Sequence, residues 1–151
     1  MIELQSAQSM RVSLESIRCG EGGLDEHRAA MLRRVPDVGD WANFPYEHLT
    51  MKDLAYLTAK TGHEFAILRG KHTDILFHGS GRNCTFDDDL AELLLSKQFR
   101  LYGHSHPGEM SPVASPEDRE VLRMIGQKTS RLIAALSGVE LQFSEDPFEV
   151  L

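Results

Sequence analysis

The stretch from residue 101 to residue 118 constrains this chain most, because it places several metal-binding side chain types between a strand and a helix. The apolar run Phe99–Gly103 predicts a strand that leads directly into His104 and His106. Side chains two residues apart on a strand point to the same face, so both imidazoles are expected to lie together. After a loop with two prolines, Asp118 falls in the first turn of a predicted helix.

Two imidazoles and one carboxylate form a typical ligand set for a zinc ion that keeps one coordination position open. We therefore predict that His104, His106 and Asp118 hold one Zn²⁺ per chain. A simpler interpretation exists, because Ser115 and Asp118 also have the spacing of a helix capping box. The two roles are compatible for Asp118, since a helix N-terminus favours the ionised carboxylate that a metal requires.

The bulk properties indicate a soluble globular protein. A chain of 151 residues fits one domain, and hydrophobic and charged contents of 41% and 26% are ordinary for such a domain. The net charge of −7 and the scattered basic residues argue against nucleic-acid binding. No apolar run approaches the roughly 20 residues of a membrane span, and the first residues lack the pattern of a signal peptide. We expect no membrane partner and a cytoplasmic location.

Hydrophobic periodicity and turn residues predict an α/β (α+β) chain with a mixed, largely antiparallel sheet flanked by helices. Residues 1–40 are expected to be a partly helical N-terminal extension and residues 41–151 the functional domain. Helices are predicted at 25–35, 50–62, 87–97 and 115–127, and strands at 64–69, 73–78, 84–86, 99–103, 131–136 and 139–143. Trp41, Phe44 and Tyr46 are expected in a loop that their rings anchor to the domain.

The segment Gly103-His-Ser-His-Pro107, followed by Ser115-Pro-Glu-Asp118, resembles the signature of the JAMM/MPN+ (JAB) metalloprotease family. The resemblance covers about residues 48–143 and implies the JAB/MPN fold, which is cytidine-deaminase-like. The family also has a glutamate on an early strand, and Glu64 fits that place, with Glu47 as the other nearby candidate. Eleven residues separate His106 from Asp118, one more than is usual in the family, and the extra residue falls in a loop. With this longer loop, the chain resembles the prokaryotic JAB-like domains.

The resemblance implies a zinc metallopeptidase or isopeptidase of the JAMM type. Its substrate would be a protein or peptide, with a ubiquitin-like conjugate as one candidate. Zinc would activate a water molecule, Glu64 would act as general base, and Ser115 would help to stabilise the oxyanion. Because Ser115 is also expected to cap its helix, its catalytic role is in tension with its structural role.

Two alternatives remain open from the sequence, and a third, deamination, is disfavoured. The chain can be a non-catalytic JAB-like scaffold, although such modules are expected to lose ligands and all are present here. It can be a RadC-like domain associated with DNA repair, which the acidic charge disfavours. Deamination is disfavoured because the His-x-Glu and Pro-Cys-x-x-Cys elements are absent. The other histidines and Cys84 lack partners in the sequence that would mark them as ligands or nucleophiles.

Overall fold

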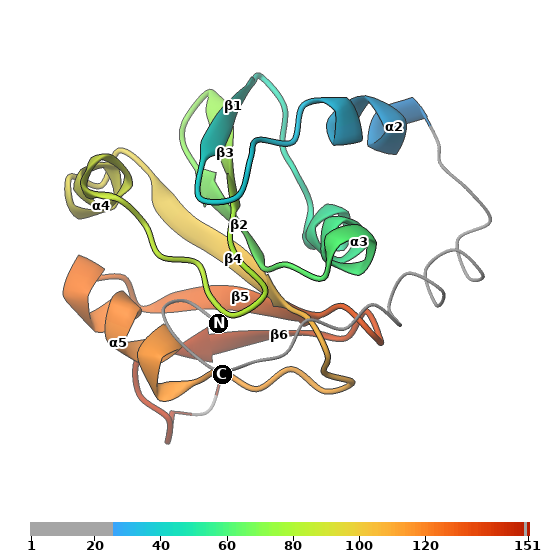
Figure 1. The fold of residues 1–151 in the computed structure, drawn as a ribbon. Helices are drawn as coiled ribbons and strands as arrows, with labels where there is room; N and C mark the ends of the chain where they lie inside the picture. Colours follow the sequence, from blue (N-terminus) through green and yellow to red (C-terminus); the bar gives the residue numbers. More distant parts are fainter. Residues whose placement is uncertain (1–25, 150) are drawn as a thin grey trace.

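The computed structural model describes residues 26–149 and residue 151. They form an α+β fold in which helices pack on both faces of a six-stranded sheet (Figure 1). The strands are β1 (Trp41–Pro45), β2 (Phe65–Arg69), β3 (Thr73–His78), β4 (Arg100–His106), β5 (Thr129–Ala134) and β6 (Glu140–Ser144). The helices in this part of the chain are α2 (Glu26–Arg33), α3 (Met51–Thr61), α4 (Asp88–Leu95) and α5 (Pro116–Ile125). The helix and tail expected before residue 25 lie outside the described residues.

The sheet has the strand order β1-β3-β2-β4-β5-β6. All neighbouring strands are antiparallel except β4 and β5, which are parallel and are joined through α5. A parallel pair needs such a crossover connection, because the chain must return to the starting edge of the sheet. The predicted mixed, largely antiparallel sheet flanked by helices is therefore confirmed.

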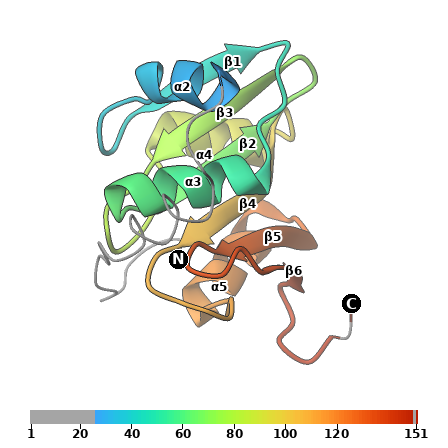
Figure 2. The same cartoon turned by 90° about the vertical axis from the view of Figure 1, so that its right-hand side faces the viewer.

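The two faces of the sheet are covered by different helices (Figures 1 and 2). We call the face under α2 and α3 the α3 face, where Met31, Leu54 and Ile67 belong to one buried cluster. We call the opposite face, under α4 and α5, the α5 face, where Leu68 and Leu122 belong to the second cluster. Each strand of the centre alternates its side chains between these two clusters.

Local signals in the sequence explain the ends of α3. Thr50 Oγ1 accepts a hydrogen bond from the Asp53 N–H at 3.1 Å, and the Asp53 carboxylate accepts one from the Thr50 N–H at 2.9 Å. Gly62 ends the helix with φ 77°, a conformation that glycine adopts without steric cost. The predicted capping box and the glycine end are both confirmed.

Two predicted hairpins are also present. Strands β2 and β3 pair antiparallel from Phe65 opposite His78 to Arg69 opposite Asp74. Strands β5 and β6 form the closing hairpin, which begins at Thr129, two residues earlier than expected.

Two local expectations were wrong. The aromatic segment that was expected to be a loop is the edge strand β1, which pairs with β3 through Trp41 opposite Phe77. Its Phe44 is buried, but Tyr46 lies beyond the strand end and is 87% exposed, so it anchors nothing in the core. The segment Cys84–Phe86 is not a strand, because a tight turn closed by Ser80 N–H and Asn83 C=O at 2.8 Å directs it back against Gly79.

Strand β4 contains a β-bulge that decides which face its histidines take. The partners of the β2 residues Ile67 and Leu68 are Gly103 and Leu101, so Tyr102 is the extra residue between them. Leu101 packs into the α5 face, while Tyr102 packs against the α3 face and a Cβ at Gly103 would overlap Met51 of α3. Tyr102 and Gly103 therefore both face α3, and the alternation of side chains between the two faces resumes one residue later than in a regular strand.

Candidate metal centre

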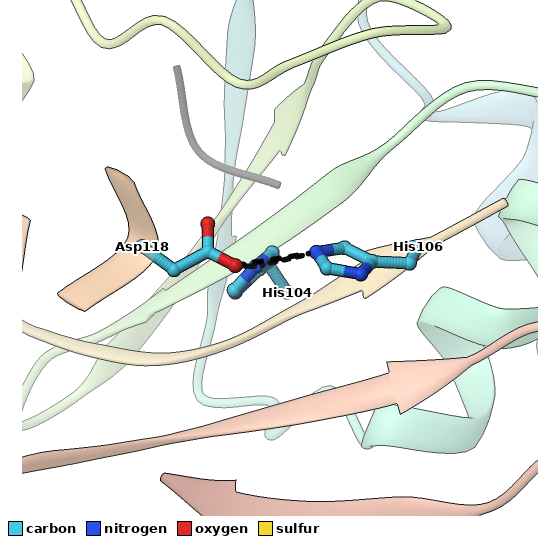
Figure 3. A group of neighbouring side chains, drawn as sticks. All are labelled: His104, His106 and Asp118. Atoms are coloured by element: carbon cyan, nitrogen blue, oxygen red, sulfur yellow. Dashed lines mark hydrogen bonds and ion pairs between the residues drawn. The ribbon is translucent and has the colours of Figure 1, made fainter. Parts of the chain in front are cut away.

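The side chains of His104, His106 and Asp118 converge on one buried point (Figure 3). The histidines come from the end of β4, and Asp118 comes from the first turn of α5. The Nε2 atoms of the two histidines are 3.2 Å apart. Asp118 Oδ2 lies 3.2 Å from His104 Nε2 and 3.4 Å from His106 Nε2. Within the described residues, this is the one group of three such side chains with ligand atoms close enough to share an ion.

The triangle of ligand atoms has the size that a tetrahedral zinc ion requires. Zinc bonds to nitrogen and oxygen of about 2.0–2.1 Å place neighbouring tetrahedral ligands about 3.3 Å apart. Octahedral coordination at the same bond length would bring neighbouring ligands to roughly 2.9 Å. The observed separations of 3.2–3.4 Å agree with the tetrahedral arrangement. The three residues can therefore hold one metal ion, and their nitrogen and oxygen donors suit zinc.

The β-bulge places both histidines on the α5 face, where Asp118 lies. Because Tyr102 and Gly103 share the α3 face, His104 and His106 alternate onto the opposite one. His104 contacts the ring of Phe143, a core residue of that face, with ring centroids 5.9 Å apart. Without the extra residue, the imidazoles would point towards α3 and away from the helix that carries Asp118.

The side chain of Ser105, which lies between the two histidines, connects β4 to β2 and α3 on the α3 face. Its Oγ accepts a hydrogen bond from the Phe65 N–H at 3.0 Å and lies 2.6 Å from Thr58 Oγ1 of α3. Ser105 is fully buried, so these contacts replace the hydrogen bonds that water would otherwise provide. They fix the residue between the two histidines to both β2 and α3.

The start of α5 serves the helix and the candidate metal centre together. Ser115 Oγ accepts a hydrogen bond from the Asp118 N–H at 2.9 Å, and Asp118 Oδ2 accepts one from the Ser115 N–H at 3.0 Å. The predicted capping box, with Pro116 at the helix start, is confirmed. The same Oδ2 atom faces both histidines, so the cap orients the carboxylate towards them. Capping uses a lone pair of the hydroxyl and leaves its proton available for donation.

Burial and charge tune the three groups differently. Burial lowers the pKa of His104 to about 4, which keeps its imidazole neutral and able to bind a metal at pH 7. Burial also disfavours the ionised form of Asp118, but the neighbouring histidines outweigh it and hold the pKa of the carboxyl well below its usual range. For His106, burial lowers the pKa, whereas hydrogen bonds to Asp118 and Glu109 and the charge of Glu64 raise it above the ordinary value. The set therefore contains an ionised carboxylate and one neutral imidazole before any metal binds.

Glu109 is a contact that the sequence analysis missed. Its Oε1 lies 3.0 Å from His106 Nδ1, so the carboxylate can accept the Nδ1 proton and leave Nε2 free for the ion. The His106-x-x-Glu109 spacing is the only signal of this contact in the sequence, and it lies in the loop between the strand and the helix. In the described part of the chain, Nδ1 of His104 is buried without a hydrogen-bond partner.

Glu64 lies immediately before β2 and is 1% exposed. Ala66 is opposite His104, so the same antiparallel register continued by two residues places Glu64 opposite His106, on the α5 face. Burial raises its pKa to about 8, with smaller opposing effects of His106, which lowers it, and Asp118, which raises it. The other candidate, Glu47, forms a surface ion pair with Arg34 at 2.8 Å.

A cavity of about 370 Å³ lies beside the candidate metal centre. Val113 from the loop after the histidines, Arg119 from α5, and Leu141 and Phe143 from β6 line it. Phe143 joins this cavity to the centre, because its ring also contacts His104. Strand β6 is the edge of the sheet, so an extended chain can reach the cavity along that edge.

Four of the five remaining histidines have polar partners that the sequence did not reveal. His63 Nδ1 lies 2.8 Å from His78 Nε2, and His78 Nδ1 lies 2.7 Å from the Pro36 carbonyl oxygen. His27 and His48 lie near the carboxylates of Asp53 and Asp74. None of these four belongs to a group of three potential ligands among the described residues.

Comparisons with protein-family models, with curated proteins and with solved structures returned no match for this chain. No helix in the described part of the chain is both long and apolar enough to span a membrane.

Proposed function

We propose that the protein is a zinc-dependent metallopeptidase or isopeptidase of the JAMM type, with the JAB/MPN fold. The observation that carries this proposal is the triangle of 3.2–3.4 Å between the ligand atoms of His104, His106 and Asp118. A His-x-His strand end and a helix-capping aspartate supply these atoms, as in the signature that the sequence resembles. Three ligands leave a fourth tetrahedral position for water, which distinguishes a catalytic zinc set from a structural one.

A bound zinc ion would lower the pKa of a coordinated water towards about 7 and polarise the carbonyl of the substrate. Glu64 lies on the same face of the sheet and would accept the proton of the attacking water. In the metal-free protein, burial raises the pKa of Glu64 to about 8. A bound cation would favour the ionised carboxylate, which could then accept the proton of the water and pass it to the leaving amine. One side chain can thus act as base and then as acid.

Ser115 would donate its hydroxyl proton to the oxygen that becomes negatively charged as the bond is attacked. Its capping contact supports this role, because the Asp118 N–H uses only a lone pair of Oγ and holds the side chain in place. Ser115 is 7% exposed, so its hydroxyl would act with little competition from water.

The substrate would bind as an extended segment in the cavity beside the centre. Val113, Leu141 and Phe143 offer apolar contacts, and the edge strand β6 offers main-chain groups for strand addition. These features suit a peptide or the flexible tail of a protein conjugate, including a ubiquitin-like one. Retention of all three ligands favours this activity over a non-catalytic scaffold or a RadC-like accessory role.

The test compares the zinc-loaded protein with its Glu64→Gln variant on fluorogenic peptides and on ubiquitin-like conjugates. We expect cleavage by the native protein, loss of cleavage in the variant, and equal zinc content in both. His72→Ala is the matched control, since His72 is exposed and far from any ligand group in sequence. Equal cleavage by the Glu64→Gln variant would remove Glu64 from the mechanism, and a native protein without zinc would contradict the proposal itself.

A further inference from the structure

Strands β2, β4, β5 and β6 lie side by side in the sheet (Figure 2). A second cavity, of about 320 Å³, is lined by residues of these four strands, and Tyr102 places it on the α3 face. Three arginines line it, namely Arg69, Arg100 and Arg131, together with Tyr102 and the polar residues Thr129 and Gln142. Among the residues that the structure describes, none with a carboxylate lines the cavity, although the whole chain carries a net charge of −7. Positive charge is therefore concentrated in one hollow of an acidic protein.

Fixed contacts hold the first arginine in this cavity. Arg69 donates from Nε and Nη2 to the buried carboxylate of Asp74, at 3.1 and 3.0 Å, and from Nη2 to the Leu49 carbonyl at 2.6 Å. Its guanidinium lies 3.8 Å from the centre of the Tyr102 ring. An arginine held in this way loses little side-chain entropy when a ligand binds.

The other two arginines keep donors available. Arg131 lies 5.3 Å from the Tyr102 ring centre and contacts Glu140 only at 3.4 Å, with both side chains partly exposed. Arg100 donates one hydrogen bond of 3.4 Å, to the Thr129 carbonyl. Asp74 compensates the charge of Arg69, and Glu140 compensates that of Arg131 weakly. The cavity consequently keeps an excess of positive charge and of N–H donors.

The cavity is separate from the candidate metal centre. Arg100 at the start of β4 lies roughly 20 Å from His106 at its end, at about 3.3 Å per residue, whereas Tyr102 is two residues from His104 and is separated from it by the face of the sheet. The histidines and Asp118 also belong to the α5 face, whereas Tyr102 belongs to the α3 face. Gln142 of β6 lines both this cavity and the cavity proposed for the substrate, and the proposed hydrolysis uses no other residue of this cavity.

We propose that this cavity is a binding site for a phosphate-class oxyanion, either inorganic phosphate or the phosphate group of a small ester. Guanidinium groups pair with phosphate through parallel hydrogen bonds, and Thr129 and Gln142 add neutral donors. Arg69 and Arg131 both lie against the Tyr102 ring, so a nucleobase would compete with two guanidinium groups for stacking on it. The phosphate group, rather than an attached base, is thus the recognised unit.

The experiment follows amide and side-chain NMR signals of the full chain during titration with sodium phosphate, and with sodium chloride at matched ionic strength. We expect phosphate to shift the signals of Tyr102, Thr129, Arg131 and Gln142 saturably, and chloride to leave them in place. Equal shifts in chloride would mean simple charge screening and would overturn the proposal. Phosphate bound at the metal centre would shift the signals of residues 104–118, which is a distinct set.

Arg100→Gln and Arg131→Gln each remove one guanidinium from an exposed position, so the fold should persist, and matching spectra check this. Each change is expected to weaken phosphate binding about tenfold, as the loss of one charge-assisted hydrogen bond implies. Arg123→Gln is the control, because Arg123 lies on α5 and pairs with Glu120 outside the cavity. Unchanged binding in both cavity variants, or equal weakening in the control, would refute the site.

A titration with phenyl phosphate separates the two sources of the anion. Shifts of the same signals, weakened by the same two variants, indicate that a phosphate group on a small ester also binds. If inorganic phosphate binds and the ester does not, the site is confined to the free anion. Failure of both to bind contradicts the proposal.

Discussion

The N–H of Phe65 donates a hydrogen bond of 3.0 Å to Oγ of Ser105, and this bond joins the strand that follows Glu64 to the strand that carries both histidines. Ala66 pairs with His104 across the sheet, so the same register continued along both strands brings Glu64 towards His106. Ser105 also lies 2.6 Å from Thr58 Oγ1, which connects the pair to α3. The position of the proposed base relative to the candidate metal ligands thus depends on a residue that faces away from both.

Ser105→Ala is expected to lower the free energy of unfolding by about 1–3 kcal/mol, because it leaves the buried Phe65 N–H and the Thr58 hydroxyl without this partner. Urea denaturation followed by circular dichroism measures the change. Ser96→Ala is the control, since Ser96 is exposed and its hydroxyl contacts only nearby backbone groups, the Leu93 carbonyl and the Gln98 N–H. A loss no larger than that of the control would show that the Ser105 contacts contribute little.

His104→Ala should abolish stoichiometric zinc binding. The change removes one of the three side chains that would bind the ion, and the two that remain would hold zinc much more weakly. Metal analysis of protein purified with zinc, and titration of the chelated protein, give the stoichiometry. We expect one zinc per chain for the native protein and for His72→Ala, and none for His104→Ala. Undiminished zinc in His104→Ala would place the metal elsewhere.

Glu109→Ala is expected to weaken zinc binding by about 10–100-fold, because His106 loses the carboxylate that orients its ring. Glu109→Gln keeps an acceptor oxygen and should retain part of the affinity. Competition with a chromogenic chelator measures both constants. Glu120→Gln on the exposed side of α5 removes the same charge without touching His106 and should leave the affinity unchanged. Equal affinities in all variants would assign Glu109 no part in positioning the ligand.

Glu64→Gln should stabilise the metal-free protein, and the gain should grow with pH. Burial raises the pKa of Glu64 to about 8 from an ordinary value of 4.5, so between these values the folded state holds a proton that the unfolded state has lost. The native protein therefore loses about 1.4 kcal/mol of stability per pH unit in this window through Glu64, and the variant does not. Thermal unfolding with a chelator at pH 5.5 and pH 7.5 measures the difference. A variant whose advantage stays constant over this range would contradict the burial of an ionisable Glu64.

Much of the site could be predicted because its signals are local. The spacing of His104 and His106 on a strand and of Ser115 and Asp118 at a helix start each follow from the geometry of one element. The convergence of these side chains, by contrast, depends on the parallel pairing of β4 with β5 and on the packing of α5, which are long-range facts.

The features that escaped prediction depend on tertiary context. Strand β1 has little pattern of its own and is extended because the edge of β3 offers it hydrogen bonds. The contact of Glu109 with His106 depends on how the loop folds back. The bulge at Tyr102 leaves no clear mark in the sequence, apart from the adjacent glycine that α3 requires.

Because of that bulge, the seven residues of β4 contribute to two different groups of polar side chains, one on each face of the sheet. On the α3 face, Tyr102 of this strand contacts the guanidinium of Arg69. On the α5 face, His104 of the same strand contacts the carboxylate of Asp118. Removal of a single residue between Leu101 and His104 would exchange the two sides, turning the imidazoles towards the packed side chains of α3. This short segment should therefore tolerate changes of side chain more readily than any change of length.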